Sequence, residues 1–371
     1  MNTELRVAVI GLGRMGRFHA RHVLELACKD QGSVLAAVVD PDPSKTDSFC
    51  RETETEFGPI RACRDVSELI ENQLADVAII CSSADSHHST AQDLIGAGYR
   101  VLLEKPLTEQ LATDRSFTNY LNQNAPDALM LAFQRRFDEP LLQAKKLLAE
   151  NKIGRPLKFI SFLEDSGPLQ DGFVSPGLLL DMSVHNIDEI LWLCGKVPQK
   201  VTCVGSRLHN HKISSVEEDF DNASMHLSFE EDLVAQIEVS RVHVAGYHVE
   251  TCIYGAEGLI RVGSFQGDPH NVSVELFGRQ GLISKQDFRM PSYESGDPDF
   301  MTRFGPAYKA ELAYFLQQCR SDRPFEVGQN EGLRAGEIAA AGMAAMNAGR
   351  FQSIALQLPL RQHTTKRYIF S

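Results

Sequence analysis

The sequence lacks several features that would assign it to a specialised class of protein. Its eight cysteines are scattered and include no Cys-X-X-Cys pair, which is typical of reduced thiols in a cytoplasmic protein rather than of a disulfide framework or a zinc site. No apolar run approaches the roughly 20 residues that span a bilayer, and no secretory signal follows the start MNTELRVAVIGLG. We therefore expect a soluble, cytoplasmic protein with no membrane partner.

An excess of positive charge is also lacking. The chain has 37 Lys and Arg against 49 Asp and Glu, a net charge of −12, which argues against nucleic acid as a partner. A nucleotide cofactor remains compatible, because one loop can bind phosphate in an acidic protein. The 371 residues, 43% of them hydrophobic, favour about two globular domains.

The first part of the chain alternates short aliphatic runs with segments of helical period, which predicts a doubly wound parallel sheet. The expected strands are Arg6–Ile10, Val34–Val39, Val77–Cys81, Val101–Glu104 and Leu129–Phe133. The expected helices are Met15–Cys28, Ser44–Phe57, Ser67–Glu71, Ser89–Ala97 and Leu111–Gln123. We assign residues 1–135 to a nucleotide-binding α/β domain.

The pattern changes after residue 135, where we place a second domain, residues 136–371. Strand-like segments from Val201 to about Ile283 follow one another without helices, which predicts an α+β domain with an open, mainly antiparallel sheet. Other expected elements are helices Leu141–Asn151, Asp181–Leu193, Tyr308–Cys319 and Glu331–Asn347, strand Leu157–Phe162, an irregular stretch over 164–177 and a loop over Met290–Gly305.

A glycine-rich loop follows the first strand and opens the first helix. Gly11 permits a tight turn, Gly13 lets backbone approach a pyrophosphate, and Gly16 allows close helix–strand packing. The second strand ends at Asp40, whose carboxylate would bind ribose hydroxyls and repel a 2′-phosphate. The pattern favours NAD over NADP, and Lys45 is the nearby cation that could weaken this preference.

Lys105 lies in a Glu-Lys-Pro turn at the carboxyl end of an expected parallel strand. Ligands bind at this edge in open α/β sheets, so Lys105 is a candidate to hydrogen-bond a substrate hydroxyl. A surface lysine after a strand is an equally acceptable interpretation of this turn alone.

Asp181 and His185 are four positions apart on an expected helix and should share one face. His185 is the natural acceptor of a hydroxyl proton, and Asp181 could orient it. Alternatively, His185 is a core histidine, with Asp188 as its structural partner. One histidine with flanking aspartates does not complete a metal site, and we expect no metal.

The whole pattern resembles the family of glucose–fructose oxidoreductase, inositol dehydrogenase and MocA-type proteins. The resemblance lies in GLGRMGRFHA, CSSADSHHSTAQDLIGAGYRVLLEKPL, FQRRFDEPLLQAKKLLAENKIGRPL, SPGLLLDMSVHNIDEILWLCG, YGAEGLIRV and YKAELAYFLQQC. It implies a Rossmann domain that binds NAD(P), a second domain whose open sheet often forms the oligomer contact, and a homo-oligomer, a dimer or a tetramer. By position, Lys105, Asp181 and His185 match the family's catalytic residues.

The resemblance also supplies the expected ligand contacts. Those to the cofactor are Gly11, Gly13, Arg14, Met15, Gly16, Asp40, Ser82, Ser83, His87, Glu104 and Lys105. Those to the substrate are Lys105, Arg135, Asp165, Asp181, His185 and Tyr247. Arg14 could equally be a solvated charge at the start of the helix.

Within the family, FQRRFD and DMSVHNIDE are most similar to inositol 2-dehydrogenases, which oxidise myo-inositol to a ketone. Two departures are Glu164-Asp165, where an Arg-Asp pair is common, and the run Ala245–Glu250, which keeps Tyr247. We expect NAD-dependent oxidation of a secondary hydroxyl of a cyclic polyol. The open alternatives are a dehydrogenase of a sugar or sugar derivative, an NAD-dependent redox-neutral glycosidase, and a non-catalytic NAD-binding regulator.

Overall fold

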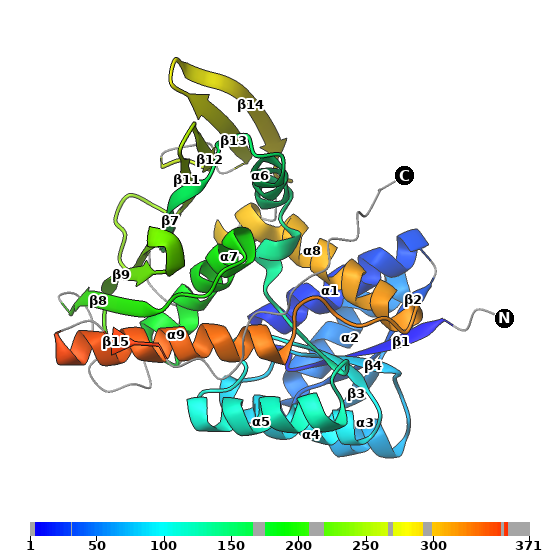
Figure 1. The fold of residues 1–371 in the computed structure, drawn as a ribbon. Helices are drawn as coiled ribbons and strands as arrows, with labels where there is room; N and C mark the ends of the chain where they lie inside the picture. Colours follow the sequence, from blue (N-terminus) through cyan, green and yellow to red (C-terminus); the bar gives the residue numbers. More distant parts are fainter. Residues whose placement is uncertain are drawn as a thin grey trace.

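A computed structural model describes residues 4–30, 32–165, 175–207, 219–265, 270–291, 299–349 and 352–354. Figure 1 shows two sheets, one surrounded by the blue and cyan helices and one formed by the green and yellow strands. In the part of the chain described, no helix combines the length and hydrophobicity needed to cross a membrane.

The first sheet has six parallel strands in the order β3-β2-β1-β4-β5-β6. They are β1 (Leu5–Ile10), β2 (Ser33–Val39), β3 (Arg61–Cys63), β4 (Val77–Ile80), β5 (Arg100–Leu103) and β6 (Leu129–Leu131). The intervening helices are α1 (Arg14–Asp30), α2 (Pro43–Phe57), α3 (Val66–Glu71), α4 (His87–Gly96) and α5 (Leu111–Asn124). This order reverses between β1 and β4, which creates a ligand crevice at the carboxyl ends of these strands. The expected doubly wound sheet is confirmed.

The second sheet has nine strands in the order β14-β13-β12-β11-β7-β10-β9-β8-β15. They are β7 (Pro156–Glu164), β8 (Lys200–Ser206), β9 (Asn222–Ser228), β10 (Val234–Ser240), β11 (His248–Gly255), β12 (Leu259–Val262), β13 (Asn271–Gly278), β14 (Gly281–Arg289) and β15 (Gln352–Ser353). All neighbours are antiparallel except β7 and β10, which are parallel. The expected open, mainly antiparallel sheet is therefore confirmed.

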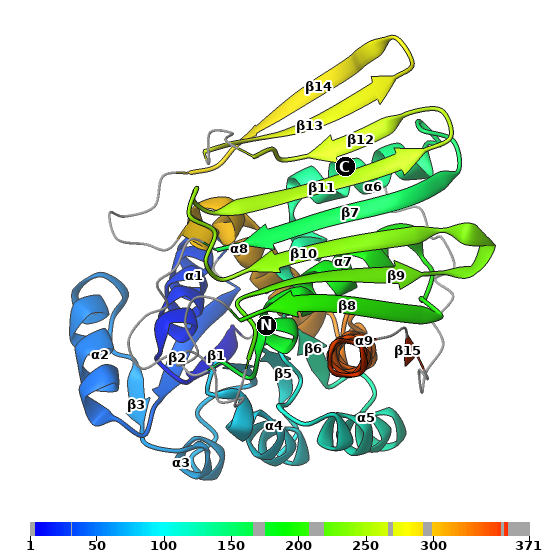
Figure 2. The ribbon, with the colours of Figure 1, turned by 90° about the vertical axis from the view of Figure 1, so that its left-hand side faces the viewer.

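Helices cover one face of this second sheet. On β7 the buried side chains Phe159, Ser161 and Leu163 alternate with more exposed ones, as expected for a strand with one covered face. The covering helices are α6 (Glu139–Ala149), α7 (Val184–Cys194) and α9 (Gln329–Ala348). Figure 2 shows these helices behind the sheet, whose front face has no helix over it.

Helix α8 (Asp299–Arg320) packs against α1 and against the short 3-10 helix η2 (Gln134–Phe137). Two hydrogen bonds from Arg303 to Asp138, 2.6 and 2.8 Å long, fix it there. The same Asp138 caps α6 by accepting a hydrogen bond from the backbone N–H of Leu141. The linkage brings the start of α8 to the carboxyl edge of the first sheet.

The expected loop over Met290–Gly305 is wrong for its last seven residues, because α8 already begins at Asp299. Gly305 and Pro306 lie inside this helix, although proline lacks the N–H that a helix interior requires. Burial of Met301, Phe304 and Tyr308 on one side of the helix outweighs that loss. Within the irregular stretch 164–177, residues 166–174 lie outside the described part of the chain.

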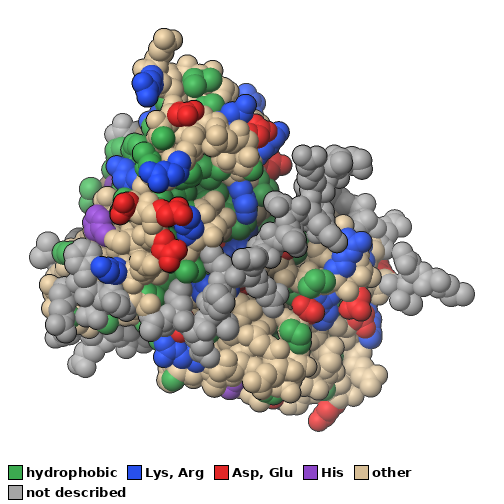
Figure 3. Space-filling view, viewed as in Figure 1, with side chains coloured by type: hydrophobic (Ala, Val, Ile, Leu, Met, Phe, Trp, Pro, Cys, Tyr) green, Lys and Arg blue, Asp and Glu red, His purple; other side chains and the backbone are tan. Residues whose placement is uncertain are grey.

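Acidic and basic side chains are interspersed over the face of the molecule seen in Figure 3. Exposed basic side chains form ion pairs with acidic ones in several places; Lys196, for example, pairs with Glu231. Exposed pairs of this kind contribute little to stability.

Candidate active site

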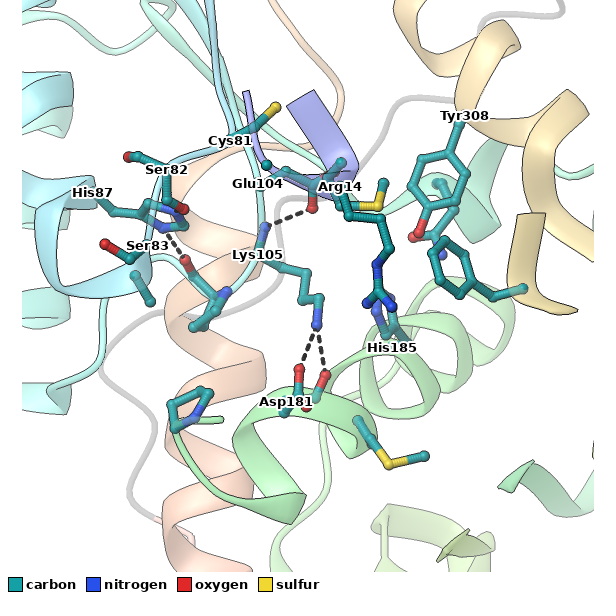
Figure 4. A pocket seen from close by; sticks show the side chains of 18 of the residues that line it. Arg14, Cys81, Ser82, Ser83, His87, Glu104, Lys105, Asp181, His185 and Tyr308 are labelled. Atoms are coloured by element: carbon teal, nitrogen blue, oxygen red, sulfur yellow. Dashed lines mark hydrogen bonds and ion pairs between the residues drawn. The ribbon is translucent and has the colours of Figure 1, made fainter. Parts of the chain in front are cut away.

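A cavity of about 920 Å³ lies at the carboxyl edge of the parallel sheet. Its walls come from the start of α1, the segments that follow β4 and β5, the helical region around Asp181, and the start of α8. Figure 4 shows these elements converging on Lys105, in the centre of the site. Most of the expected site residues line it: Gly13, Arg14, Met15, Ser82, Ser83, His87, Glu104, Lys105, Arg135, Asp165, Asp181, His185 and Tyr247.

The three glycines of the loop have different surroundings. Gly11 has a φ of +85°, and a Cβ there would come within 2.7 Å of the Ser82 backbone nitrogen. A Cβ on Gly16 would overlap the carbonyl oxygen of Gly11. At Gly13, by contrast, an added Cβ would meet no described atom within 4 Å, and the residue lines the cavity. The loop therefore fits a pyrophosphate, because no described side chain covers the Gly13 backbone on the side from which a phosphate would approach.

Asp40 lies beneath this loop and is absent from the cavity lining. Its carboxylate accepts hydrogen bonds from the backbone N–H groups of Leu12 (2.8 Å) and Asp42 (3.0 Å). Lys45 Nζ is 3.5 Å from Asp40 Oδ1 and lines the cavity. Because each carboxylate oxygen can accept more than one hydrogen bond, Asp40 keeps acceptor capacity for a ribose.

The segments after β4 and β5 are held together by a buried histidine. His87 Nδ1 is 2.8 Å from the Pro106 carbonyl oxygen, and Nε2 is 3.1 Å from the Ser82 carbonyl oxygen. Burial lowers the pKa of His87. The Lys105–Pro106 peptide is cis. Glu104 in turn accepts a hydrogen bond from the backbone N–H of Lys105 (3.3 Å) and lies 2.9 Å from His19 Nε2.

Lys105 extends from the end of β5 to the other wall of the cavity. Its Nζ donates to the Asp181 carboxylate and to the Asp181 carbonyl oxygen, both at 2.8 Å (Figure 4). The side chains of Lys105 and Asp181 are 19% and 14% exposed. Burial alone would raise the pKa of Asp181, but the charges of Lys105 and Arg241 outweigh burial and lower it. Asp181 is therefore an anion in this site.

The expected face-sharing of Asp181 and His185 on one α-helix is not what the structure shows. Asp181 lies in a π-helical turn, η3 (Leu179–Ser183), and α7 begins only at Val184. Its carboxylate is bonded to Lys105, to Ser175 (3.2 Å) and to Arg241 (3.4 Å), with no hydrogen bond to His185 among the described residues. The two side chains nevertheless line the same cavity.

His185 is 8% exposed, and its Nδ1 has no hydrogen-bond partner among the described residues. Burial, then the charges of Lys105 and Arg135, lower the pKa of His185 well below its ordinary value. The imidazole is therefore neutral near pH 7. Asp188, the alternative partner, forms two hydrogen bonds with Arg136, at 2.6 and 2.8 Å.

The remaining expected substrate contacts approach the cavity from three elements. Arg135 is buried and donates to Glu189 at 2.6 Å. Asp165 follows β7, and its backbone N–H donates to the Ser240 carbonyl. Tyr247 precedes β11, and burial raises the pKa of its phenol. All three line the cavity.

Sequence reasoning missed two parts of the cavity wall. Arg241 is 3% exposed and contacts Asp181 directly. In the sequence, it is marked only as a charged residue at the end of a strand with alternating side chains. The second part is the apolar start of α8, from which Phe300, Phe304 and Tyr308 line the cavity. Arg14 lies over the Phe300 ring at 5.0 Å. The spacing of these three aromatic residues, four positions apart, is typical of one helix face and could have predicted the helix. Gly305 and Pro306, which are unfavourable in a helix interior, lie between them.

Comparison with known families agrees with both parts of this architecture. Residues 5–131 match the oxidoreductase family with an NAD-binding Rossmann fold, and residues 141–261 match the GFO/IDH/MocA C-terminal domain. The chain belongs to the GFO/IDH/MocA oxidoreductase family. The resemblance noted from sequence is thereby confirmed, as is the expectation of an NAD-dependent oxidoreductase.

Among family members, the chain is 27% identical over 325 residues to scyllo-inositol 2-dehydrogenase (NAD(+)) of Bacillus subtilis, covering 87% of this chain and 88% of that one. It is 29% identical over 334 residues to myo-inositol 2-dehydrogenase of Thermotoga maritima, covering 89% and 93%. The solved structure of scyllo-inositol dehydrogenase from Lactobacillus casei with bound NAD(H) and scyllo-inositol superposes with a TM-score of 0.76 at 25% identity, over 95% and 99% of the two chains.

Proposed function

We propose that this chain oxidises a secondary hydroxyl of a cyclic polyol with NAD, as an inositol 2-dehydrogenase does when it converts myo-inositol to a keto-inositol. The observation that carries the proposal is the convergence of Lys105, Asp181 and His185 on the cavity that the glycine loop enters. The substrates named for the relatives in Bacillus and Thermotoga support the same class of substrate.

NAD bound at the glycine loop would supply the hydride acceptor, and the protein residues would handle the proton. His185 is neutral, so it can accept the proton of the reacting hydroxyl. The ammonium of Lys105 stabilises the negative charge that develops on that oxygen. Asp181 keeps Lys105 in place and can accept a hydrogen bond from a second hydroxyl. Positioned acid–base help of this kind contributes roughly 100- to 10,000-fold to the rate.

The cavity wall suits a ligand with many hydroxyl groups. Asp165, Arg241 and Tyr247 bring an acceptor, a cation and a phenol to one side of it. A site built from buried polar groups discriminates strongly against ligands that leave those groups unpaired. Since the run Ala245–Glu250 around the cavity residue Tyr247 departs from the run common in inositol dehydrogenases, we infer that the preferred ring differs from myo-inositol in configuration or substitution.

We further infer that residues 1–135 bind the cofactor, that residues 136–371 bind the substrate, and that the protein is a cytoplasmic homo-oligomer. The uncovered face of the second sheet supports an oligomer, because Val204 and Val234 point from it and are 71% and 41% exposed. Light scattering after size exclusion would give the mass of the particle in solution. A monomer at micromolar concentration would contradict the inferred homo-oligomer.

The proposed reaction is tested by assaying NADH formation with a panel of inositol isomers, methylated inositols and aldoses, each with NAD and with NADP. A marked preference for one cyclitol with NAD is the expected outcome. A preference for an aldose would show that the substrate is a sugar and not a cyclic polyol. Failure to form NADH with every compound, in a protein that binds NAD, would contradict the dehydrogenase proposal.

A further inference from the structure

Three side chains that commonly bind metals meet on the face of the second sheet that faces away from the cavity. Glu164 ends β7 and His248 begins β11, and these two residues are directly paired across the strands. His243 lies in the connection between β10 and β11. Leu163 and Asp165 both line the cavity, so Glu164 between them points to the opposite side of the strand.

The three residues are close enough to share one ion. One ligand atom from each lies within 4.8 Å of the other two. Glu164 Oε2 is 2.7 Å from His248 Nδ1 and 3.5 Å from His243 Nε2. Ligand atoms that are each about 2.1 Å from a tetrahedral zinc ion are separated by similar distances, so small side-chain movements would complete the geometry.

The second nitrogen of each imidazole supplies an independent observation. His243 Nδ1 is 2.6 Å from the Gly246 carbonyl oxygen, which can only accept a hydrogen bond. The proton of a neutral His243 is therefore on Nδ1, and the lone pair on Nε2 faces Glu164. His248 Nε2 is 3.3 Å from Glu250 Oε2. Metal-binding histidines almost always donate their other N–H to a carbonyl or a carboxylate in this way.

We propose that Glu164, His243 and His248 form a binding site for one divalent transition-metal ion, with Zn²⁺ as the preferred ion. Two imidazoles and one carboxylate are borderline nitrogen and oxygen ligands that suit zinc, and three protein ligands leave one position for water. In the single chain, the side chains of Glu164, His243 and His248 are 20%, 22% and 8% exposed.

This proposal departs from the expectation of no metal, which considered the cysteine spacing and the histidine near Asp181. The ligands escaped that reasoning because Glu164 and His248 are 84 positions apart in sequence and only the pairing of β7 with β11 brings them together.

The ion would act as a clamp behind the cavity wall. It would join the end of β7 to the connection between β10 and β11. That connection begins at Arg241 and ends at Tyr247, and both residues line the cavity. Glu164, His243 and His248 are thus positioning residues. Removing the ion should raise the Michaelis constant for the substrate more than that for NAD.

The test is a titration with Co²⁺ of full-length protein that has been treated with a chelator and desalted. We expect one Co²⁺ per chain, a visible absorption band typical of low-coordinate cobalt, and displacement by Zn²⁺. Glu164→Gln and His243→Gln should each weaken binding by more than about 100-fold, and Glu250→Gln by about 10- to 100-fold. His226→Gln is the matched control, because His226 is on the same sheet face on β9 and outside the cluster.

Equal cobalt affinity in wild type and His243→Gln, or loss of binding in His226→Gln alone, would overturn the proposal. So would the absence of a specific band in the wild type, which would leave the cluster as an ion-paired group only. Circular dichroism checks that each variant folds. X-ray absorption of the zinc-loaded wild type needs no variant: two imidazoles and no sulfur ligand are expected, and any other first shell would contradict the site.

Discussion

Lys105 donates two hydrogen bonds to a single residue, Asp181, one to its carboxylate and one to its backbone carbonyl, each 2.8 Å long. Lys105 follows a strand of the parallel sheet, and Asp181 lies in the helical region that packs under the second sheet. The pair therefore joins the two halves of the molecule at the place where they enclose the cavity.

Replacing Lys105 by methionine should lower kcat by about 100- to 10,000-fold, because the ammonium that stabilises the reacting oxygen is lost. The dissociation constant for NAD, measured by calorimetry, should change far less than kcat, because the glycine loop is intact. Asp181→Asn is the companion variant, and we expect it to lower kcat less while raising the Michaelis constant for the substrate. A Lys105→Met enzyme with wild-type kcat would remove Lys105 from the chemistry.

Replacing His185 by glutamine should also reduce kcat by about 100- to 10,000-fold without loss of NAD binding. The pH profile gives a second readout. A general base works in its neutral form, so activity falls as the pH drops through its pKa. Because burial and the charges of Lys105 and Arg135 lower the pKa of His185, the acid limb of kcat/KM should lie well below pH 6.5. An acid limb at or above pH 6.5 that disappears in His185→Gln would show that the pKa is not lowered.

Replacing Asp40 by alanine should reduce the preference for NAD over NADP by about tenfold or more, because the carboxylate no longer repels a 2′-phosphate. The value of kcat/KM should also fall with both cofactors, since Asp40 accepts a hydrogen bond from the Leu12 N–H in the glycine loop. Lys45→Ala is the control for the neighbouring cation and should lower activity with NADP only. The measurement is kcat/KM for both cofactors, and an unchanged ratio in Asp40→Ala would exclude Asp40 as the selector.

Asp114 should make folding stability depend on pH. It is 3% exposed on α5, and burial raises its pKa from 3.8 to about 7, opposed by hydrogen bonds from Thr108. A raised pKa means that the stability present below pH 3.8 is lost as the pH rises through about 7. Asp114→Asn should therefore gain stability at pH 8, by at most about 4 kcal/mol, and gain almost none at pH 4. Urea unfolding at a series of pH values measures this, and a gain independent of pH would refute the assignment.

The sequence predicted best where a local pattern decides the structure. Continuous apolar runs predicted five of the six parallel strands and missed the short β3 (Arg61–Cys63), and the spacing of Gly11, Gly13 and Gly16 predicted the loop between β1 and α1. It predicted poorly where distant contacts override local signals. The end of the expected loop, up to Gly305, belongs to a helix that packing maintains despite Pro306. Arg241 carried no pattern that separates a cavity residue from an ordinary strand end. Local patterns marked Lys105 and Asp181 separately and the family resemblance grouped them, but no local rule predicts that they touch.

The π-helical turn over Leu179–Ser183 has a consequence for the whole site. A turn of this kind holds one more residue than an α-helical turn, so the chain before it is rotated by about 100° relative to an uninterrupted α-helix. The fully packed helix that follows thus does not dictate where the carboxylate of Asp181 points. The extra residue of the π-helical turn therefore sets the direction of the Asp181 side chain independently of α7. Deleting one residue of this turn would move the Asp181 carboxylate away from Lys105 and leave His185 in place.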